Sequence, residues 1–135
     1  MSSVFDKLNL KDQTAILVLN APASFAPELA TLTGVTVSRN AQDTTQALFL
    51  LAFVTTLAEV AAAAQVAAKQ TQGDAIVWLA YPKGTSKNYR CEFNRDTGWE
   101  ALGQAGFQPV RQVAIDADWS ALRFRRVAFI KTIRK

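Results

Sequence analysis

Two loops of this chain carry residue types that could bind or transform a small anionic molecule. The first loop, residues 82–86 (PKGTS), holds Lys83 beside a glycine and two hydroxyl groups. A lysine can neutralise a phosphate or a carboxylate, and a desolvated lysine with a lowered pKa can act as a base or a nucleophile. The second loop, residues 116–120 (DADWS), holds Asp116, which could act as a base or as the partner of a ribose hydroxyl. Together with two residues of an earlier loop, the candidate ligand-binding residues are Asn20, Ser24, Lys83, Thr85, Ser86, Asp116 and Trp119.

Several of these candidates also have an ordinary structural interpretation. Surface lysines are common after strands, so Lys83 alone does not indicate chemistry. An aspartate at a turn usually hydrogen-bonds its own backbone, which is the alternative for Asp116. Trp119 could form the aromatic wall of a site, but a tryptophan is more typically a packing residue. For Arg123 we expect a structural ion pair with Asp116 or Asp118 across a hairpin.

The composition excludes several kinds of catalytic site. The chain has no histidine and a single cysteine, Cys91, which we interpret as inert. These counts exclude a Ser-His-Asp or Cys-His nucleophile, a histidine-bearing zinc site, a Cys-x-x-Cys pair and an intramolecular disulfide. We predict no metal site. One cysteine is typical of a reducing compartment and the charged N-terminus has no signal-peptide core, so we expect a cytoplasmic location.

The net charge of +4 comes from the C-terminal end of the chain. From Arg123 onward there are six basic residues and no acidic residue, whereas the preceding part has nine basic and eleven acidic residues. A basic end, here about residues 126–135, can bind the phosphates of nucleic acid. Basic residues on an edge strand also discourage aggregation, which is the interpretation we favour. Nucleic-acid binding is therefore the weaker alternative.

Continuous apolar runs predict strands that are buried on both faces of a sheet. The central run, residues 75–81 (AIVWLAY), ends at Pro82, which has no N–H to continue a ladder. Runs at residues 14–19 and 47–54 predict two further buried strands, and residues 35–38 predict a short one.

Helices are predicted between these strands. One runs from Pro27 to about Leu32, because proline suits the first helical position. A later helix begins near Asn94 or Asp96 and ends at Gly106. It should present Trp99 and Leu102 inward.

Thr56 and Glu59 form a capping box that predicts the start of a helix ending near Gln70. Residues 47–68 as a whole could also be interpreted as a membrane span. Glu59 lies near the middle of that segment, where a charge is costly in lipid, so we favour a strand followed by a helix. We expect the helix to lie on the sheet through Leu57, Val60, Ala61, Ala64 and Ala68.

The last two strands, residues 109–115 and 121–130, are predicted to form an antiparallel hairpin. In the second of them apolar residues alternate with Arg123 and Arg125, the period of a strand with one wet face. Apolar residues at 127–130 could pair with a second copy of the chain, so a homodimer is one alternative.

Strands that alternate with helices predict a parallel sheet with right-handed crossovers. We therefore expect residues 1–135 to form a single α/β domain, a Rossmann-like three-layer sandwich. Its mostly parallel sheet of about five or six strands is closed by the antiparallel C-terminal hairpin. This order is similar to the fold of class I methyltransferases, in which a terminal hairpin also follows the last helix. The resemblance implies that residues 35–38 form one edge of the sheet, although residues 39–45 are brief for a crossover and leave that strand's direction open.

In such sheets ligands bind outside the carboxyl ends of the strands, near the point where strand order reverses. The candidate residues would converge there. Dinucleotide and S-adenosylmethionine sites need glycines after the first strand. This chain has Pro22 and Phe25 in that loop, and Arg39 and Asn40 where an acidic ribose partner is expected. We interpret the cofactor pocket as degenerate and predict no cofactor.

Four segments, LNAP, AYPK, NRDTGW and AIDADWSALRF, together resemble one bacterial family, known as domain of unknown function 3052. The YPK and WSALRF parts are the most specific, and the resemblance covers nearly the whole chain. The chain departs from the family pattern mainly in its extended tail after Arg126. The resemblance implies no particular activity.

We therefore expect a small cytosolic domain, without catalytic activity, that binds a small anionic ligand or a protein partner. The alternative is an enzyme that acts on a small anionic or nucleotide-like substrate through Lys83 and Asp116, with Ser86 as a further group. We expect no association with membranes.

Overall fold

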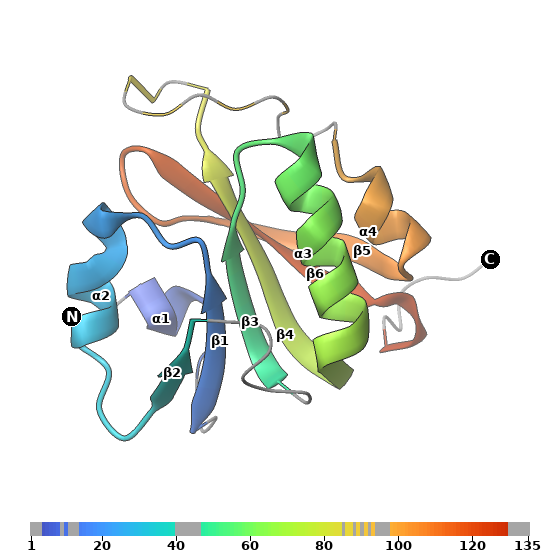
Figure 1. The fold of residues 1–135 in the computed structure, drawn as a ribbon, viewed down its shortest axis with the longest axis horizontal. Coiled ribbons are helices and arrows are strands. Elements are labelled where there is room, and N and C mark those ends of the chain that lie inside the picture. The colour runs from blue at the N-terminus through green and yellow to red at the C-terminus, as the bar shows by residue number, and fades with distance from the viewer. Residues whose placement is uncertain are drawn as a thin grey trace.

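The fold is built on one six-stranded sheet with the strand order β2-β1-β3-β4-β6-β5 (Figure 1). The structure is a computed structural model and describes residues 4–8, 10, 14–39, 47–84, 86–87, 89, 91, 93 and 98–129. The strands are β1 (Ala15–Leu19), β2 (Thr36–Ser38), β3 (Ala47–Phe53), β4 (Thr71–Pro82), β5 (Phe107–Ala114) and β6 (Trp119–Arg126).

Strands β1, β2, β3 and β4 are parallel, and β6 runs antiparallel to both of its neighbours, β4 and β5. The predicted mostly parallel sheet with a closing hairpin is therefore confirmed. The short strand β2 pairs in parallel with β1, which settles the direction that the sequence left open. Strand β6 lies between β4 and β5, so the return strand of the hairpin is the one that joins the parallel part.

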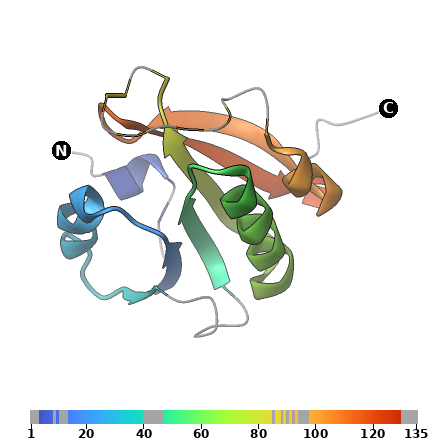
Figure 2. The same ribbon diagram turned by 45° about the horizontal axis from the view of Figure 1, so that its top comes forward.

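Helices cover both faces of the sheet and complete a three-layer sandwich (Figure 2). One face is covered by α3 (Leu57–Gln70) and α4 (Glu100–Gln104). The other face is covered by α1 (Val4–Lys7) and by η1 (Ala23–Phe25), which leads into α2 (Ala26–Ala30). A last short helix, η3 (Val127–Phe129), follows β6. The predicted fold class is confirmed.

Helix α3 begins at the predicted capping box. The Thr56 side chain accepts a hydrogen bond from the Glu59 backbone N–H at 3.1 Å, and Glu59 accepts from the Thr56 N–H. The segment that could be interpreted as a membrane span is thus divided into strand β3 and a helix of 14 residues. Among the described residues, no helix is long and apolar enough to cross a membrane.

Three predictions about individual elements were wrong. Helix α3 buries Val60, Ala63, Ala64 and Ala67, while Leu57 is 49% exposed. Val60 and Ala64 of the predicted face are buried, whereas Ala61 and Ala68 are exposed. Alanines lie on several sides of this helix, so the sequence does not distinguish the buried side from its neighbours. Residues 127–129 form a 3-10 helix rather than the end of a strand.

The helix that was predicted from Asn94 or Asp96 begins at Glu100, and residues 94–97 lie outside the described part of the chain. Its apolar residues Trp99 and Leu102 are buried, as predicted.

Two basic residues at the end of β6 form hydrogen bonds and an ion pair with other parts of the domain. Arg126 donates hydrogen bonds to the carbonyl oxygens of Ala67, Thr71 and Gly73 and so closes the C-terminal end of α3. Arg125 forms a bidentate ion pair with Asp74, with distances of 2.8 and 2.7 Å. Part of the basic excess therefore has a structural role, and residues 130–135 of the basic end lie outside the described residues.

The ion pair between Asp74 and Arg125 predicts a defined dependence of stability on pH. The Arg125 guanidinium lowers the pKa of Asp74 below its ordinary value by hydrogen bonding and by its charge. A carboxyl group whose pKa is lower in the folded state stabilises the fold at pH values above about 4, the pKa of the unfolded state. This stabilisation is lost as the pH falls through the lower pKa of the folded state. The side chains are 36% and 35% exposed, so we expect a contribution of less than about 1 kcal/mol.

We test this with urea unfolding of the wild type and Asp74→Asn between pH 7 and pH 2.5. The wild type should be slightly more stable than the variant at pH 7, and the difference should shrink below about pH 4. A difference that grows as the pH falls would contradict the assignment.

Candidate functional site

The carboxyl ends of β1 and β3 meet at the point where the sheet changes direction. After β2 the chain returns to the other side of β1, so β1 and β3 are neighbours there. This is the position at which open α/β sheets bind ligands. Asn20, the first residue after β1, has a φ of 60° and donates a hydrogen bond from Nδ2 to the Phe53 carbonyl oxygen at 3.2 Å. Asparagine tolerates this left-handed conformation better than most residues, so it turns the chain where a cofactor-binding loop would have glycine.

Aromatic rings fill the space behind this hydrogen bond. The centroid of the Phe25 ring lies 4.9 Å from that of Phe53. The centroid of the Trp119 ring lies 5.1 Å from that of Phe53, and these two rings pack edge to face. All three side chains are at most 3% exposed. Phe25 reaches this place because Pro22 precedes a 3-10 helix, η1, that directs the phenylalanine inward. The loop after β1 thus contributes apolar side chains to the core.

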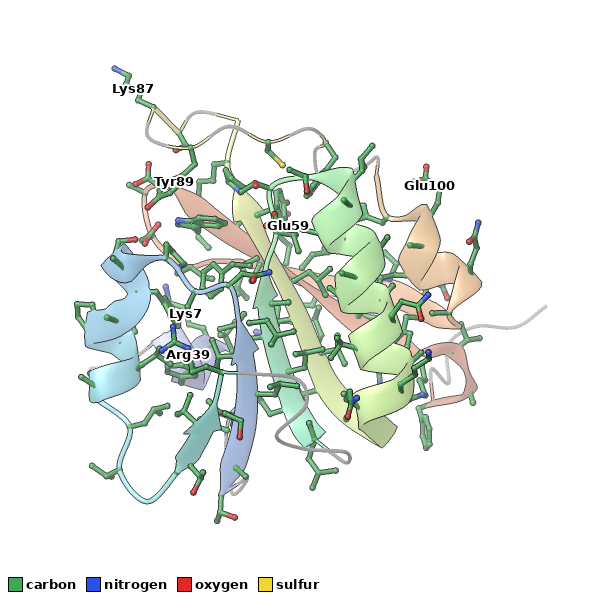
Figure 3. All side chains as sticks on the ribbon, viewed as in Figure 1. Lys7, Arg39, Glu59, Lys87, Tyr89 and Glu100 are labelled. Atoms are coloured by element: carbon green, nitrogen blue, oxygen red, sulfur yellow. The ribbon has the colours of Figure 1, made fainter. Side chains whose placement is uncertain are left out.

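The N-terminus of α3 is occupied by the chain itself. Glu59 Oε1 accepts hydrogen bonds from Thr55 N at 2.7 Å, from Thr55 Oγ1 at 3.0 Å and from Thr56 N at 3.3 Å. Free N–H groups at a helix N-terminus would otherwise favour an anionic ligand. Figure 3 shows Glu59 at the carboxyl edge of the sheet. Its carboxylate takes the place that a ligand's phosphate or carboxylate could have.

The loop after β4 is joined to the turn of the C-terminal hairpin. The Lys83 backbone N–H donates to the Asp118 carbonyl oxygen at 2.8 Å, and Ser86 Oγ donates to Asp118 Oδ1 at 2.9 Å. Ser86 Oγ also accepts from the Tyr89 N–H at 3.2 Å. These hydrogen bonds hold Lys83 at the rim of the sheet, where its side chain is half-buried.

Asp116 stabilises the hairpin turn. Its Oδ1 accepts hydrogen bonds from the backbone N–H groups of Asp118 at 2.8 Å and Trp119 at 2.9 Å. This is the local aspartate turn that the sequence offered as the structural alternative. Asp118, two residues later, is the carboxylate that reaches the loop after β4.

Tyr89 connects the same loop to the region after β1. Its hydroxyl lies 3.4 Å from Ser24 Oγ, and its ring lies 4.8 Å from the Trp119 ring. Figure 3 shows Tyr89 directed back toward the sheet edge, whereas Lys87 projects away from it. Trp119 Nε1 is buried and has no hydrogen-bond partner within the described residues. A buried indole N–H of this kind is uncommon.

Six of the seven predicted candidates lie at one edge of the sheet, and their ligand-binding role stays a prediction. Asn20, Ser24, Lys83, Ser86, Asp116 and Trp119 are all found there, and Thr85 lies outside the described residues. The sequence interpretation missed Tyr89 and Asp118. Asp118 shares its turn with Asp116, so the spacing alone could not decide which carboxylate meets the loop.

The expected pairing of Arg123 with Asp116 or Asp118 was wrong. Arg123 lies opposite Trp78 on β4 and Arg111 on β5, four residues along β6 from Trp119. The hairpin turn is therefore too far along the strand for its carboxylates to reach Arg123.

A hollow lies away from this edge, between α3 and α4. It has a volume of about 370 Å³ and is lined by Ala61, Ala64, Gln65, Ala68, Ala101, Gln104 and Ala105. It contains no titratable group and offers only amides and methyl groups, so it has no means of acid–base chemistry.

Solved structures with a similar fold include methyltransferases. A SAM-dependent methyltransferase from Aquifex aeolicus has a TM-score of 0.63 at 14% identity, over 92% of this chain and 88% of its own. The N-methyltransferase NodS from Bradyrhizobium japonicum WM9 has a TM-score of 0.57 at 11% identity, over 91% and 92%. The Methanococcus jannaschii fibrillarin, a pre-rRNA processing protein, has a TM-score of 0.56 at 11% identity, over 86% and 67%.

No protein-family model matches the chain, and no curated protein matches its sequence. Membership of the family known as domain of unknown function 3052 stays a prediction. At these low identities the structural likeness extends to the fold alone. The chain has a Rossmann-like, methyltransferase-like α/β fold.

The hydrogen bond of Asn20 predicts a specific order of stability for two variants. Asn20→Ala loses the bond to the Phe53 carbonyl and keeps a side chain at positive φ, so its free energy of unfolding should fall by about 1–3 kcal/mol. Asn20→Gly loses the same bond but adopts this φ freely, so it should be less destabilised. Urea unfolding of both variants measures the order. A glycine variant less stable than the alanine variant would contradict the assignment.

Proposed function

We propose that this chain is a non-catalytic binding module whose methyltransferase-like fold holds its own side chains where a cofactor would lie. The observation that carries the proposal is the contact of Asn20 Nδ2 with the Phe53 carbonyl, beside the buried ring of Phe25. A dinucleotide or S-adenosylmethionine needs close approach to backbone N–H groups in this loop. The amide, the ring and Pro22, which has no N–H, oppose such an approach.

The binding surface in this proposal is the rim of the carboxyl edge, outside the filled crevice. Lys83 supplies a positive charge there, and the hydroxyls of Ser24 and Tyr89 lie 3.4 Å apart nearby. A cation beside hydroxyl groups favours a small anionic ligand, which we propose as the occupant. We also propose that the protein acts in the cytoplasm and belongs to the family of domain of unknown function 3052, on the motifs YPK and WSALRF.

A thermal-shift comparison of the wild type, Lys83→Ala and Lys87→Ala tests this surface. Lys83→Ala keeps the backbone hydrogen bond to Asp118, so a change in binding reports the ammonium group. Lys87 is the matched control, because it lies in the same loop and its side chain points away from the sheet (Figure 3). The panel contains S-adenosylmethionine, nucleotides, sugar phosphates and simple anions.

We expect an anion of this panel to raise the Tm of the wild type and of Lys87→Ala, and to have no effect on Lys83→Ala. A ligand at a hundred times its Kd stabilises a fold by about 2.7 kcal/mol, which is a shift of several degrees for a domain of this size. We expect no shift with S-adenosylmethionine. Turnover of any compound that Lys83→Ala abolishes would contradict the non-catalytic role and favour the enzyme. The absence of any shift would contradict the ligand and favour a protein partner.

A further inference from the structure

The face of the sheet on which α1 packs carries three arginines, on β5 and β6, in place of apolar residues. Arg123 on β6 is the direct partner of Arg111 on β5, and directly opposed residues of an antiparallel pair project from the same face. Arg125 follows two residues later on that face. Trp78, the other direct partner of Arg123, is covered there because its Nε1 donates to the Leu8 carbonyl at 2.8 Å.

The positive charge of this cluster is only partly neutralised. Asp74 binds Arg125 through both of its carboxylate oxygens. Arg111 and Arg123 lie directly opposite one another as like charges, an arrangement that destabilises a sheet, and no ion pair joins either of them to another described residue. Burial and the charges of Arg125 and Arg111 lower the pKa of Arg123, while the charge of Asp74 acts in the opposite direction.

The Arg123 guanidinium also has an unused donor. Its Nε is buried and has no hydrogen-bond partner within the described residues. Arg111 is exposed and Arg123 is half-buried on the strand beside it, so an anion from solvent can reach the Arg111 guanidinium. Arginine presents N–H donors in a planar fork that fits two oxygens of a phosphate or carboxylate.

We infer that the sheet face between Arg111 and Arg123 is a binding site for a phosphate group. A phosphate bound there would accept from both guanidinium groups and would separate their charges. The site lies roughly 13 Å along β6 from Trp119, by the rise of a strand over four residues. It is thus distinct from the rim that holds Lys83, and it does not depend on the function proposed for that rim. The phosphate could be free or part of a nucleic-acid backbone, since both present the same oxygens.

Thermal unfolding of the wild type, Arg111→Gln and Arg39→Gln tests this site. Arg111 is exposed, so its replacement should leave the fold intact, and Arg39 is an exposed arginine near the opposite edge of the sheet. Each protein is measured in chloride, in inorganic phosphate at the same ionic strength, and with a short oligothymidylate. Inorganic phosphate at ten times its Kd should raise the Tm of the wild type and of Arg39→Gln by about 4 °C.

The expected result for Arg111→Gln has two parts. In chloride its Tm should equal or exceed that of the wild type, because a like-charge pair has been removed. In phosphate it should show no rise. The site is supported if either anion raises the Tm of the wild type but not that of Arg111→Gln. The anion with the larger effect at equal phosphate concentration then identifies the source of the phosphate. Equal rises in the wild type and Arg111→Gln, or no rise with either anion, would overturn the inference. Persistence of the rise in Lys83→Ala separates this site from the rim.

Discussion

The hydrogen bond from Asn20 to the Phe53 carbonyl joins two strands whose following segments leave in opposite directions. The chain after β1 leads to β2 on one side of the sheet, and the chain after β3 leads through α3 to β4 on the other. This divergence opens a crevice at the carboxyl ends in α/β sheets. Here the amide of Asn20 bridges the two strands, and the rings of Phe25, Phe53 and Trp119 pack behind it. These contacts lie where such a crevice would open.

Several polar side chains at the same edge accept hydrogen bonds from backbone N–H groups nearby in the sequence. Asp116 binds two N–H groups of its turn, and Glu59 binds the N–H groups that precede α3. Ser86 links its loop to Asp118. A carboxylate or hydroxyl that stabilises a turn in this way is less free to bind a ligand. Among the described residues of the rim, the proposed ligand depends on Lys83 and the neighbouring hydroxyls.

The strands and the fold class were predictable from the sequence because each depends on a local pattern. Continuous apolar runs identified β1, β3 and β4, and the capping box identified the first turn of α3. The buried face of α3 was not predictable, because a run of alanines has no contrast between its sides. The partner of Arg123 depended on register: the residues opposite it are Arg111 and Trp78 rather than the aspartates of the nearby turn. Tyr89 was missed because its position follows from the loop's path over the hairpin, which no local pattern encodes.

The most direct test of the proposal that the chain's own side chains close this crevice is a map of backbone amide chemical shifts with and without saturating S-adenosylmethionine. If the chain's own side chains occupy the crevice, the amides of Asn20, Val54 and Thr55 should keep their chemical shifts. Clustered changes at these amides, which lie beside the carboxyl ends of β1 and β3, would show that the cofactor enters the crevice. That result would contradict the account.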